Sequence, residues 1–192
     1  MIKTVCVYCS SSDKINNVYA KDAEALGAFL GQRGMKVING AGGIGLMRVV
    51  SDAVLSAGGA VTGIIPHFMV RNGWCHQHLT EVIRTETMHE RKKIMADLSD
   101  AAIALPGGYG TFEELLEIIT WRQLGLYNHP VIILNTNHYY DPLLEMFRRA
   151  AGENFLRKED ARIWHVAHTP EEVMAILDNY NPVAFVHTSA IS

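Results

Sequence analysis

The sequence predicts an α/β protein built on a single doubly wound, mostly parallel sheet. Short apolar runs alternate with amphipathic helical stretches along the chain, a pattern typical of βαβ units. The runs 101–106 and 130–135 show no polar alternation, so helices should cover both faces of the sheet. Glycine- or serine-rich loops at 9–13, 39–45 and 106–110 follow predicted strands, and such loops form a polar crevice at the carboxyl edge of a parallel sheet.

The individual elements follow from local patterns, taken in chain order. The strands are short apolar runs bounded by glycine, proline or polar residues, at 4–9, 36–39, 60–66, 79–85, 101–106, 130–135 and 162–167. The helices carry apolar residues at helical spacing, at 17–34, 46–59, 88–100, 111–125, 141–152 and 170–180. Glycines end the first two helices, at Gly31 or Gly34 and at a glycine pair.

Composition limits the function classes. A chain of 192 residues with 48% hydrophobic content predicts one domain over 1–192, with 181–192 as a C-terminal tail. Charged residues make up only 19%, which indicates surface buried in an oligomer. The net charge of -3 and the lack of a basic tract argue against a nucleic-acid partner. No apolar run is long enough to span a membrane and no leader is evident, so we expect a cytoplasmic protein.

Cysteines and histidines suggest a metal or redox site only weakly. Cys6 and Cys9 form a C-x-x-C, but residues three apart in a strand point to opposite faces, which favours two small buried residues. The segment 67–78 holds three histidines and Cys75 at a spacing that matches no known site, and we expect a polar loop there.

The stretch 105–118, "LPGGYGTFEELLEI", allows two interpretations. Thr111 and Glu114 have the spacing of a capping box, which would make Glu114 a structural residue at the helix start. Alternatively, the glycine-rich amides bind a phosphate at the positive helix N-terminus. Glu114 would then face the opposite end of a ribose, where glycosidic cleavage develops positive charge. A nucleoside monophosphate has both features.

A second motif, "MHERKKIM" at 88–95, places Arg91 on an otherwise apolar helical stripe. Arg91 could grip a phosphate or ribose oxygen with two hydrogen bonds. A solvated basic face with methionines packed beneath it explains the pattern as well.

Together, the two motifs resemble the Lonely Guy family of cytokinin-activating enzymes, once widely labelled possible lysine decarboxylases. The family pattern is Met-x-x-Arg-Lys, then Pro-Gly-Gly-x-Gly-Thr-x-x-Glu. The matching residues are Met88, Arg91, Lys92, Pro106, Gly107, Gly108, Gly110, Thr111 and Glu114. The resemblance runs from about residue 3 to residue 180.

This resemblance implies a Rossmann-like fold and a homodimer with active sites near the subunit contact. It implies hydrolysis of a nucleoside 5′-monophosphate, cytokinin riboside 5′-monophosphate or AMP, to free base and ribose 5-phosphate. Arg91 and Glu114 would form the catalytic pair, with no metal or organic cofactor. The expected substrate-binding residues are Lys92, Gly107, Gly108, Tyr109, Gly110 and Thr111, with Ser11 and Gly42 from the other two loops.

The chain departs from the family pattern in the loops. Ser10 and Ala41 stand where the family commonly has glycine, and Arg48 replaces the glycine after Gly-Leu-Met. An acidic residue expected near 71–73 is absent. These loops should shape the base and ribose pocket, so the sequence indicates the reaction type more firmly than the base.

Three other functions remain open. A non-catalytic nucleotide-binding module would not need Arg91 and Glu114 together. Amino-acid decarboxylation would need a lysine for pyridoxal phosphate, yet Lys92 and Lys93 lie on a charged helix. Hydride transfer with NAD would need an acidic residue after 40–45, and none is present at the expected distance.

Overall fold

The computed structural model describes residues 2–157, 160 and 163–181. Its centre is a seven-stranded sheet in the order β4-β3-β2-β1-β5-β6-β7, and every neighbouring pair is parallel. The strands are β1 (Thr4–Tyr8), β2 (Lys36–Asn39), β3 (Ala60–Pro66), β4 (Glu81–Thr85), β5 (Ala101–Ala104), β6 (Val131–Leu134) and β7 (His165–Ala167). The predicted doubly wound parallel sheet is confirmed.

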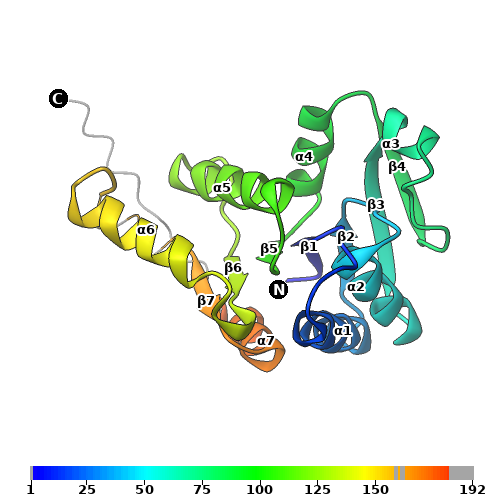
Figure 1. Cartoon of the computed structure of the whole chain (residues 1–192), viewed down its shortest axis with the longest axis horizontal. Coiled ribbons are helices and arrows are strands. Elements are labelled where there is room, and N and C mark those ends of the chain that lie inside the picture. Colours follow the sequence, from blue (N-terminus) through cyan, green and yellow to red (C-terminus); the bar gives the residue numbers. More distant parts are fainter. Residues whose placement is uncertain (1, 158–159, 161–162, 182–192) are drawn as a thin grey trace.

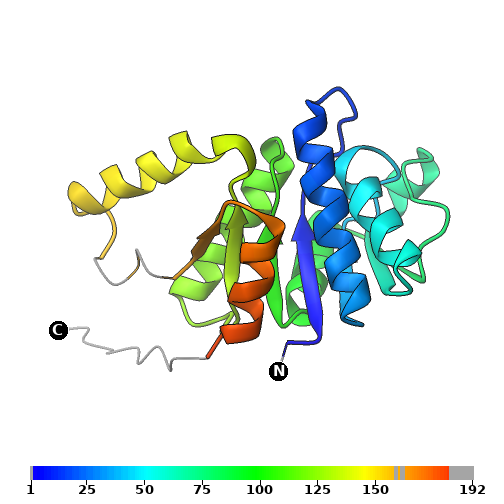
Figure 2. The same ribbon diagram turned by 90° about the horizontal axis from the view of Figure 1, so that it is seen from below.

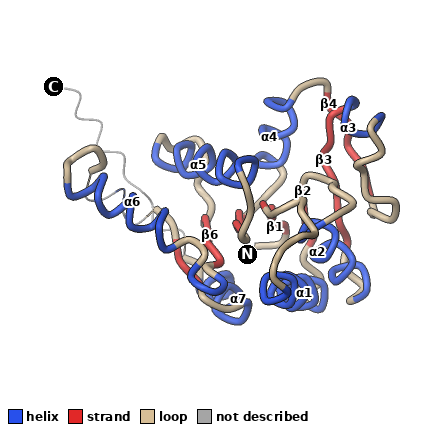
Figure 3. Tube along the Cα trace, viewed as in Figure 1, coloured by secondary structure: helices blue, strands red, loops and turns tan. Residues whose placement is uncertain are grey.

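Helices connect the strands, and the alternation can be followed in Figure 3. They are α1 (Asn17–Gln32), α2 (Gly45–Ser56), α3 (His67–Arg71), α4 (Met88–Asp97), α5 (Tyr109–Gln123), α6 (Asp141–Gly152) and α7 (Pro170–Asn179), with a 3₁₀ turn η1 (Thr136–His138). No helix in the described part of the chain is long and apolar enough to cross a membrane.

Two apolar layers separate the sheet from its helices, with α1, α2 and α7 on one face and α4 and α5 on the other (Figure 1). Val5 and Val7 of β1 join the first layer, whereas Cys6 and Tyr8 join the second. Cys9 belongs to the first layer, so Cys6 and Cys9 lie on opposite faces. The interpretation of this C-x-x-C as two buried structural residues is confirmed.

Helix α6 differs from the other long helices because none of its residues is fully buried. Leu143, Leu144 and Phe147 pack partly against the second layer, whereas Met146 stays 60% exposed. Figure 2 shows α6 projecting beyond the sheet. This helix therefore presents apolar surface to the outside of the molecule.

Several predicted boundaries differ from the structure. The helix predicted at 88–100 ends at Asp97, and the strand predicted at 79–85 begins at Glu81. Helix α3 lies inside the segment predicted to be a polar loop. The predicted tail, apart from residue 181, and the first residue of the strand predicted at 162–167 lie outside the described residues.

Candidate active site

A pocket of about 910 Å³ opens where the strand order reverses. From β1 the chain continues into β2, which lies on one side of β1 in the sheet. On the other side of β1 lies β5, and the chain continues from β5 into β6. Crevices at such reversal points are the usual ligand sites of open parallel sheets. Ser11 from the loop after β1, Gly42 from the loop after β2 and residues 108–111 after β5 all line this pocket. The structure therefore brings the three predicted loops together.

The start of α5 corrects the capping-box prediction. The helix begins at Tyr109 with Gly108 as its N-cap, so Thr111 is already the third helical residue. Its side chain occupies the space beside Gly107, where a Cβ would clash with it. The capping box is therefore wrong for Thr111 and Glu114, and the carboxylate is not used to close the helix.

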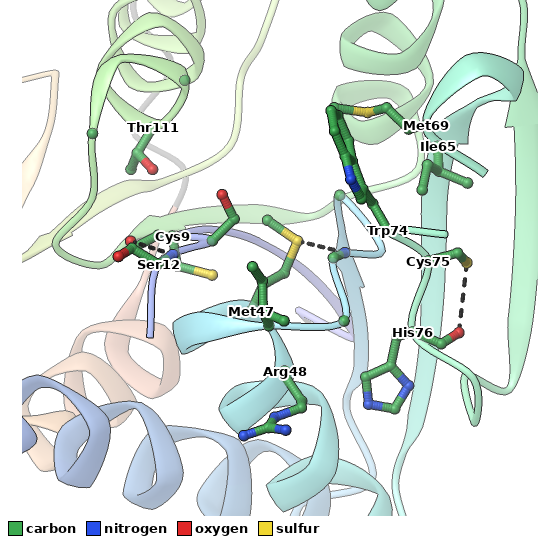
Figure 4. A pocket seen from close by; sticks show the side chains of 18 of the residues that line it. Cys9, Ser12, Met47, Arg48, Ile65, Met69, Trp74, Cys75, His76 and Thr111 are labelled. Atoms are coloured by element: carbon green, nitrogen blue, oxygen red, sulfur yellow. Dashed lines mark hydrogen bonds between the residues drawn. The ribbon is translucent and has the colours of Figure 1, made fainter. Parts of the chain in front are cut away.

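The same helix start supplies an anion cradle. The first amides of an α-helix have no intrahelical acceptor, and the helix end carries partial positive charge. In α5 these amides belong to Tyr109, Gly110 and Thr111, which line the pocket together with Gly108. Gly107 is buried and is not part of the pocket lining. Figure 4 shows Thr111 and Ser12 at one end of the pocket, with Trp74 and Met69 at the other.

Glu114 lies one helical turn beyond the cradle and lines the same pocket. The residue is only 7% exposed. Burial raises the pKa of Glu114 from 4.5 to about 7, and the Arg91 guanidinium opposes this rise. A carboxyl group with a pKa near neutrality can exchange a proton during a reaction at physiological pH.

Arg91 faces Glu114 across the pocket from α4. Its Nη2 is 3.7 Å from Glu114 Oε1, which is an ion-pair distance rather than a hydrogen bond. The Arg91 Nε donates to the Ile64 carbonyl oxygen at 3.0 Å, and Nη1 approaches Met88 Sδ at 3.8 Å. The guanidinium is thus fixed by the end of β3 while part of it lines the pocket.

The position of the Arg91 guanidinium leaves room only for glycine at residue 40. A Cβ on Gly40 would collide with Arg91 Nη2. The loop around it is held by Asn39, which is fully buried, accepts from the Ala41 amide at 2.9 Å and donates to Ser51 Oγ at 2.9 Å. The loop after β2 therefore determines where Arg91 can sit.

The structure places Lys92 outside the pocket, in contrast to the predicted substrate contact. Its Nζ forms ion pairs with Glu113 and, at 3.0 Å, with Glu117, both on α5. Successive helical residues point about 100° apart, so Arg91 and Lys92 reach different neighbours. Both carboxylates bind this buried lysine, although the Glu113 side chain remains 54% exposed and that of Glu117 28% exposed.

Sequence reasoning missed the outer wall of the pocket. Residues 73–78 line it, and the wall also includes the apolar side chains of Ile65, Met69 and Met88. The segment is joined to the glycine loop by the Gly43 amide, which donates to the Trp74 carbonyl at 2.8 Å. Trp74 is 53% exposed beside the pocket. A tryptophan inside an otherwise polar stretch was the sequence signal that could have identified this wall.

His76 is also part of the pocket wall. It is buried, its Nε2 lies 2.9 Å from Asp52 Oδ1, and its Nδ1 accepts from the His78 amide at 3.1 Å. This arrangement makes His76 a structural brace between α2 and the segment 73–78. No group of three or more potential metal ligands occurs among the described residues.

Comparisons with known proteins show which family the chain belongs to. The family model described as "Possible lysine decarboxylase" matches residues 47–177. The cytokinin riboside 5′-monophosphate phosphoribohydrolase LOG of Oryza sativa subsp. japonica is 43% identical over 180 residues, covering 94% of this chain and 74% of that protein. The Arabidopsis thaliana enzyme LOG5 is 43% identical over 181 residues, covering 94% of this chain and 79% of that protein. The chain belongs to the Lonely Guy family.

A solved structure supports the fold of this Lonely Guy protein. The molybdenum cofactor carrier protein of Chlamydomonas reinhardtii superposes with a TM-score of 0.71 at 18% identity, covering 93% of this chain and 97% of that chain. At this identity the likeness shows the fold alone.

The departures from the family pattern can now be placed. Ser10 and Arg48 line the pocket, and Arg48 is exposed. Ala41 adopts a φ of 61°, a left-handed conformation in which glycine is the least strained residue. These substitutions lie around the pocket, whereas Arg91 and Glu114 keep the family identity.

Proposed function

We propose that this protein hydrolyses the N-glycosidic bond of a nucleoside 5′-monophosphate to free base and ribose 5-phosphate. The observation that carries the proposal is the buried Arg91–Glu114 pair, which lies one helical turn from an anion-binding helix start in one pocket. The relatives named as cytokinin riboside 5′-monophosphate phosphoribohydrolases, at 43% identity, support the same reaction.

In the proposed mechanism, the start of α5 binds the phosphate end of the nucleotide and Glu114 acts at the glycosidic end. The amides at the start of α5 bind the 5′-phosphate, and Arg91 holds a phosphate or ribose oxygen. As the bond between C1′ and the base nitrogen breaks, its electron pair leaves with the base, and positive charge develops on the sugar. The Glu114 carboxylate stabilises that charge and accepts a proton from the water whose oxygen bonds to C1′. This proton then passes to the departing base nitrogen, so that free base and ribose 5-phosphate result.

Glu114 suits this task because its pKa lies close to neutral pH. Its pKa of about 7 leaves a large ionised fraction at physiological pH, and the ionised form is a stronger base than an ordinary carboxylate. The wall of Met69, Trp74 and Met88 is apolar and fits a purine, with or without an N6-prenyl group. We therefore propose AMP and N6-substituted AMP as the substrate class.

Lysine decarboxylation fits this pocket poorly. A pyridoxal-dependent reaction requires a lysine amine that can form a Schiff base. Among the described residues no lysine lines the pocket, and Lys92 is bound by two carboxylates. The alternative that deserves a test is a nucleotide-binding protein without hydrolytic activity.

We also propose that the protein is a single-domain, cytoplasmic homodimer. All seven strands join one sheet, which supports a single domain. The three cysteines are free, which suits a reducing compartment. Exposed apolar side chains on α5, on α6 and after each of them support a second subunit, namely Leu116, Leu124, Leu126, Met146 and Phe155.

The deciding experiment is incubation of the purified protein with AMP and with N6-isopentenyl-AMP, followed by detection of free base and ribose 5-phosphate. Glu114→Gln serves as the matched variant. Base release by the wild type and not by the variant is the expected result. Measurable nucleotide binding without release of base from either compound would refute hydrolysis and favour the binding protein.

A further inference from the structure

Lys92 has an unusual environment for a lysine that does not line the pocket. Its side chain is only 7% exposed, although an isolated buried ammonium is costly. Two carboxylates of α5 compensate this charge, Glu113 and Glu117, the latter at 3.0 Å. Burial lowers the pKa of Lys92, but the two carboxylates outweigh burial and raise it, so the ammonium stays charged.

The two carboxylates flank the proposed catalytic glutamate in sequence and in space. Glu113 precedes Glu114 directly, and Glu117 follows it by nearly one turn of the same helix. Lys92, Glu114 and Glu117 border one small void behind the pocket. A lysine that holds both flanking residues restrains the rotation of α5 about its axis, and thereby the direction of Glu114.

Lys92 also follows Arg91 on α4. The ion pairs between the two helices therefore start from adjacent residues: Arg91 pairs with Glu114 in the pocket, and Lys92 pairs with Glu113 and Glu117 outside it. We propose that Lys92 is a positioning residue, which does not touch the substrate but ties α5 to α4 through Glu113 and Glu117 so that Glu114 faces Arg91. This inference rests on the proposed hydrolytic function.

The charges around Glu114 give the proposal a distinctive signature. The charged groups facing it from α4 and α5 are Arg91, Lys92, Glu113 and Glu117. The neighbouring titratable groups are Cys6 and Tyr8 of β1 and Cys9 directly after it, and burial raises the pKa of each of them, so they stay neutral near pH 7. Lys92 lowers the pKa of Glu114, whereas Glu113 and Glu117 raise it.

Two variants should therefore shift the titration of Glu114 in opposite directions. Lys92→Met keeps the buried volume but removes the cation, so the pKa of Glu114 should rise by about 0.5 to 1 pH unit. The double variant Glu113→Gln/Glu117→Gln removes the two anions, so the same pKa should fall by about as much. Both shifts come from the charges of the removed groups, so they test the placement of Lys92, Glu113 and Glu117 beside Glu114.

The test combines a titration that does not need activity with kinetics. Carboxyl ¹³C NMR of glutamate-labelled protein follows Glu114, whose signal is assigned by its loss in Glu114→Gln. For AMP hydrolysis, Lys92→Met should lower kcat about tenfold or more with KM changed less than about twofold, because a transition-state group is displaced and ground-state binding is kept. Lys92→Arg should recover part of kcat.

Distinct outcomes separate this inference from the proposed function. A wild type that releases no base refutes the proposed hydrolysis, and the NMR titration still decides the placement of Lys92. An active wild type with unshifted Glu114 titration in both variants overturns the positioning role. A rise in KM with kcat retained in Lys92→Met overturns it as well, because that result makes Lys92 a substrate ligand. If Lys92→Met fails to fold, the double variant on partly exposed residues carries the same test.

Discussion

Replacement of Glu114 by glutamine should stabilise the protein while it abolishes the proposed reaction. The fold holds this carboxyl group at 7% exposure and raises its pKa from 4.5 to about 7. The folded state therefore binds the proton more tightly than the unfolded state does. Its contribution to stability is complete below about pH 4.5 and is lost as the pH rises towards 7.

The size of the effect follows from the two pKa values. Each pH unit between them corresponds to 1.36 kcal/mol, so ionisation of Glu114 costs the folded wild type roughly 3 kcal/mol at pH 8. Glutamine is close in shape to the protonated acid and does not ionise. We expect Glu114→Gln to match the wild type near pH 4.5 and to exceed its free energy of unfolding by about 3 kcal/mol at pH 8.

Urea unfolding of both proteins at fixed concentration, in steps from pH 5 to pH 8, measures this difference. Glu145→Gln is the matched control, because Glu145 is exposed on α6 and pairs only with the exposed Arg148 in the described contacts. Its loss should change stability by less than about 1 kcal/mol at every pH. A stability difference between Glu114→Gln and the wild type that does not grow from pH 5 to pH 8 would refute the reasoning.

Three further predictions concern the pocket. At pH values below about 7, Glu114 takes up a proton, and kcat/KM for AMP should decrease about tenfold for each further pH unit. A flat profile between pH 5.5 and 7.5 would argue against an ionised Glu114. Gly40→Ala should lower kcat/KM about 100-fold by displacing Arg91, whereas Gly152→Ala, where a Cβ meets open space, should leave it unchanged; full activity of Gly40→Ala would contradict the assigned place of Arg91. Trp74→Ala should raise KM for N6-isopentenyl-AMP about tenfold more than for AMP, because it removes apolar surface from the outer wall; an equal effect on both nucleotides would show that Trp74 does not contact the N6 group.

The sheet and the central pair could be predicted from the sequence because their signals are local. Buried parallel strands need continuous apolar runs, and those runs gave the order of the elements. The opposite faces of Cys6 and Cys9 followed from the two-residue period of a strand. Arg91 stood out because a charge is rare on an otherwise apolar stripe, and Glu114 because it follows a glycine-rich helix start. The resemblance to the family joined the two residues into a catalytic pair.

The remaining features depend on contacts that spacing does not encode. The spacing of Thr111 and Glu114 fits a helix start, but α5 begins two residues earlier. Lys92 was predicted to contact the substrate, yet the direction of a side chain depends on the helix that packs beside it. The outer wall could not be predicted because residues 73–78 reach the pocket by folding back onto the glycine loop.

That fold-back is made by the main chain. The Gly43 amide donates to the Trp74 carbonyl, and the His76 amide donates to the Ala41 carbonyl, both at 2.8 Å. Main-chain bonds of this kind persist when most side chains change, proline aside. Selection can therefore exchange the residues at 74, 75, 77 and 78 to suit a new base, while α4 and α5 keep the Arg91–Glu114 pair of the proposed mechanism. The fold thus permits one reaction to be inherited while its leaving group diversifies.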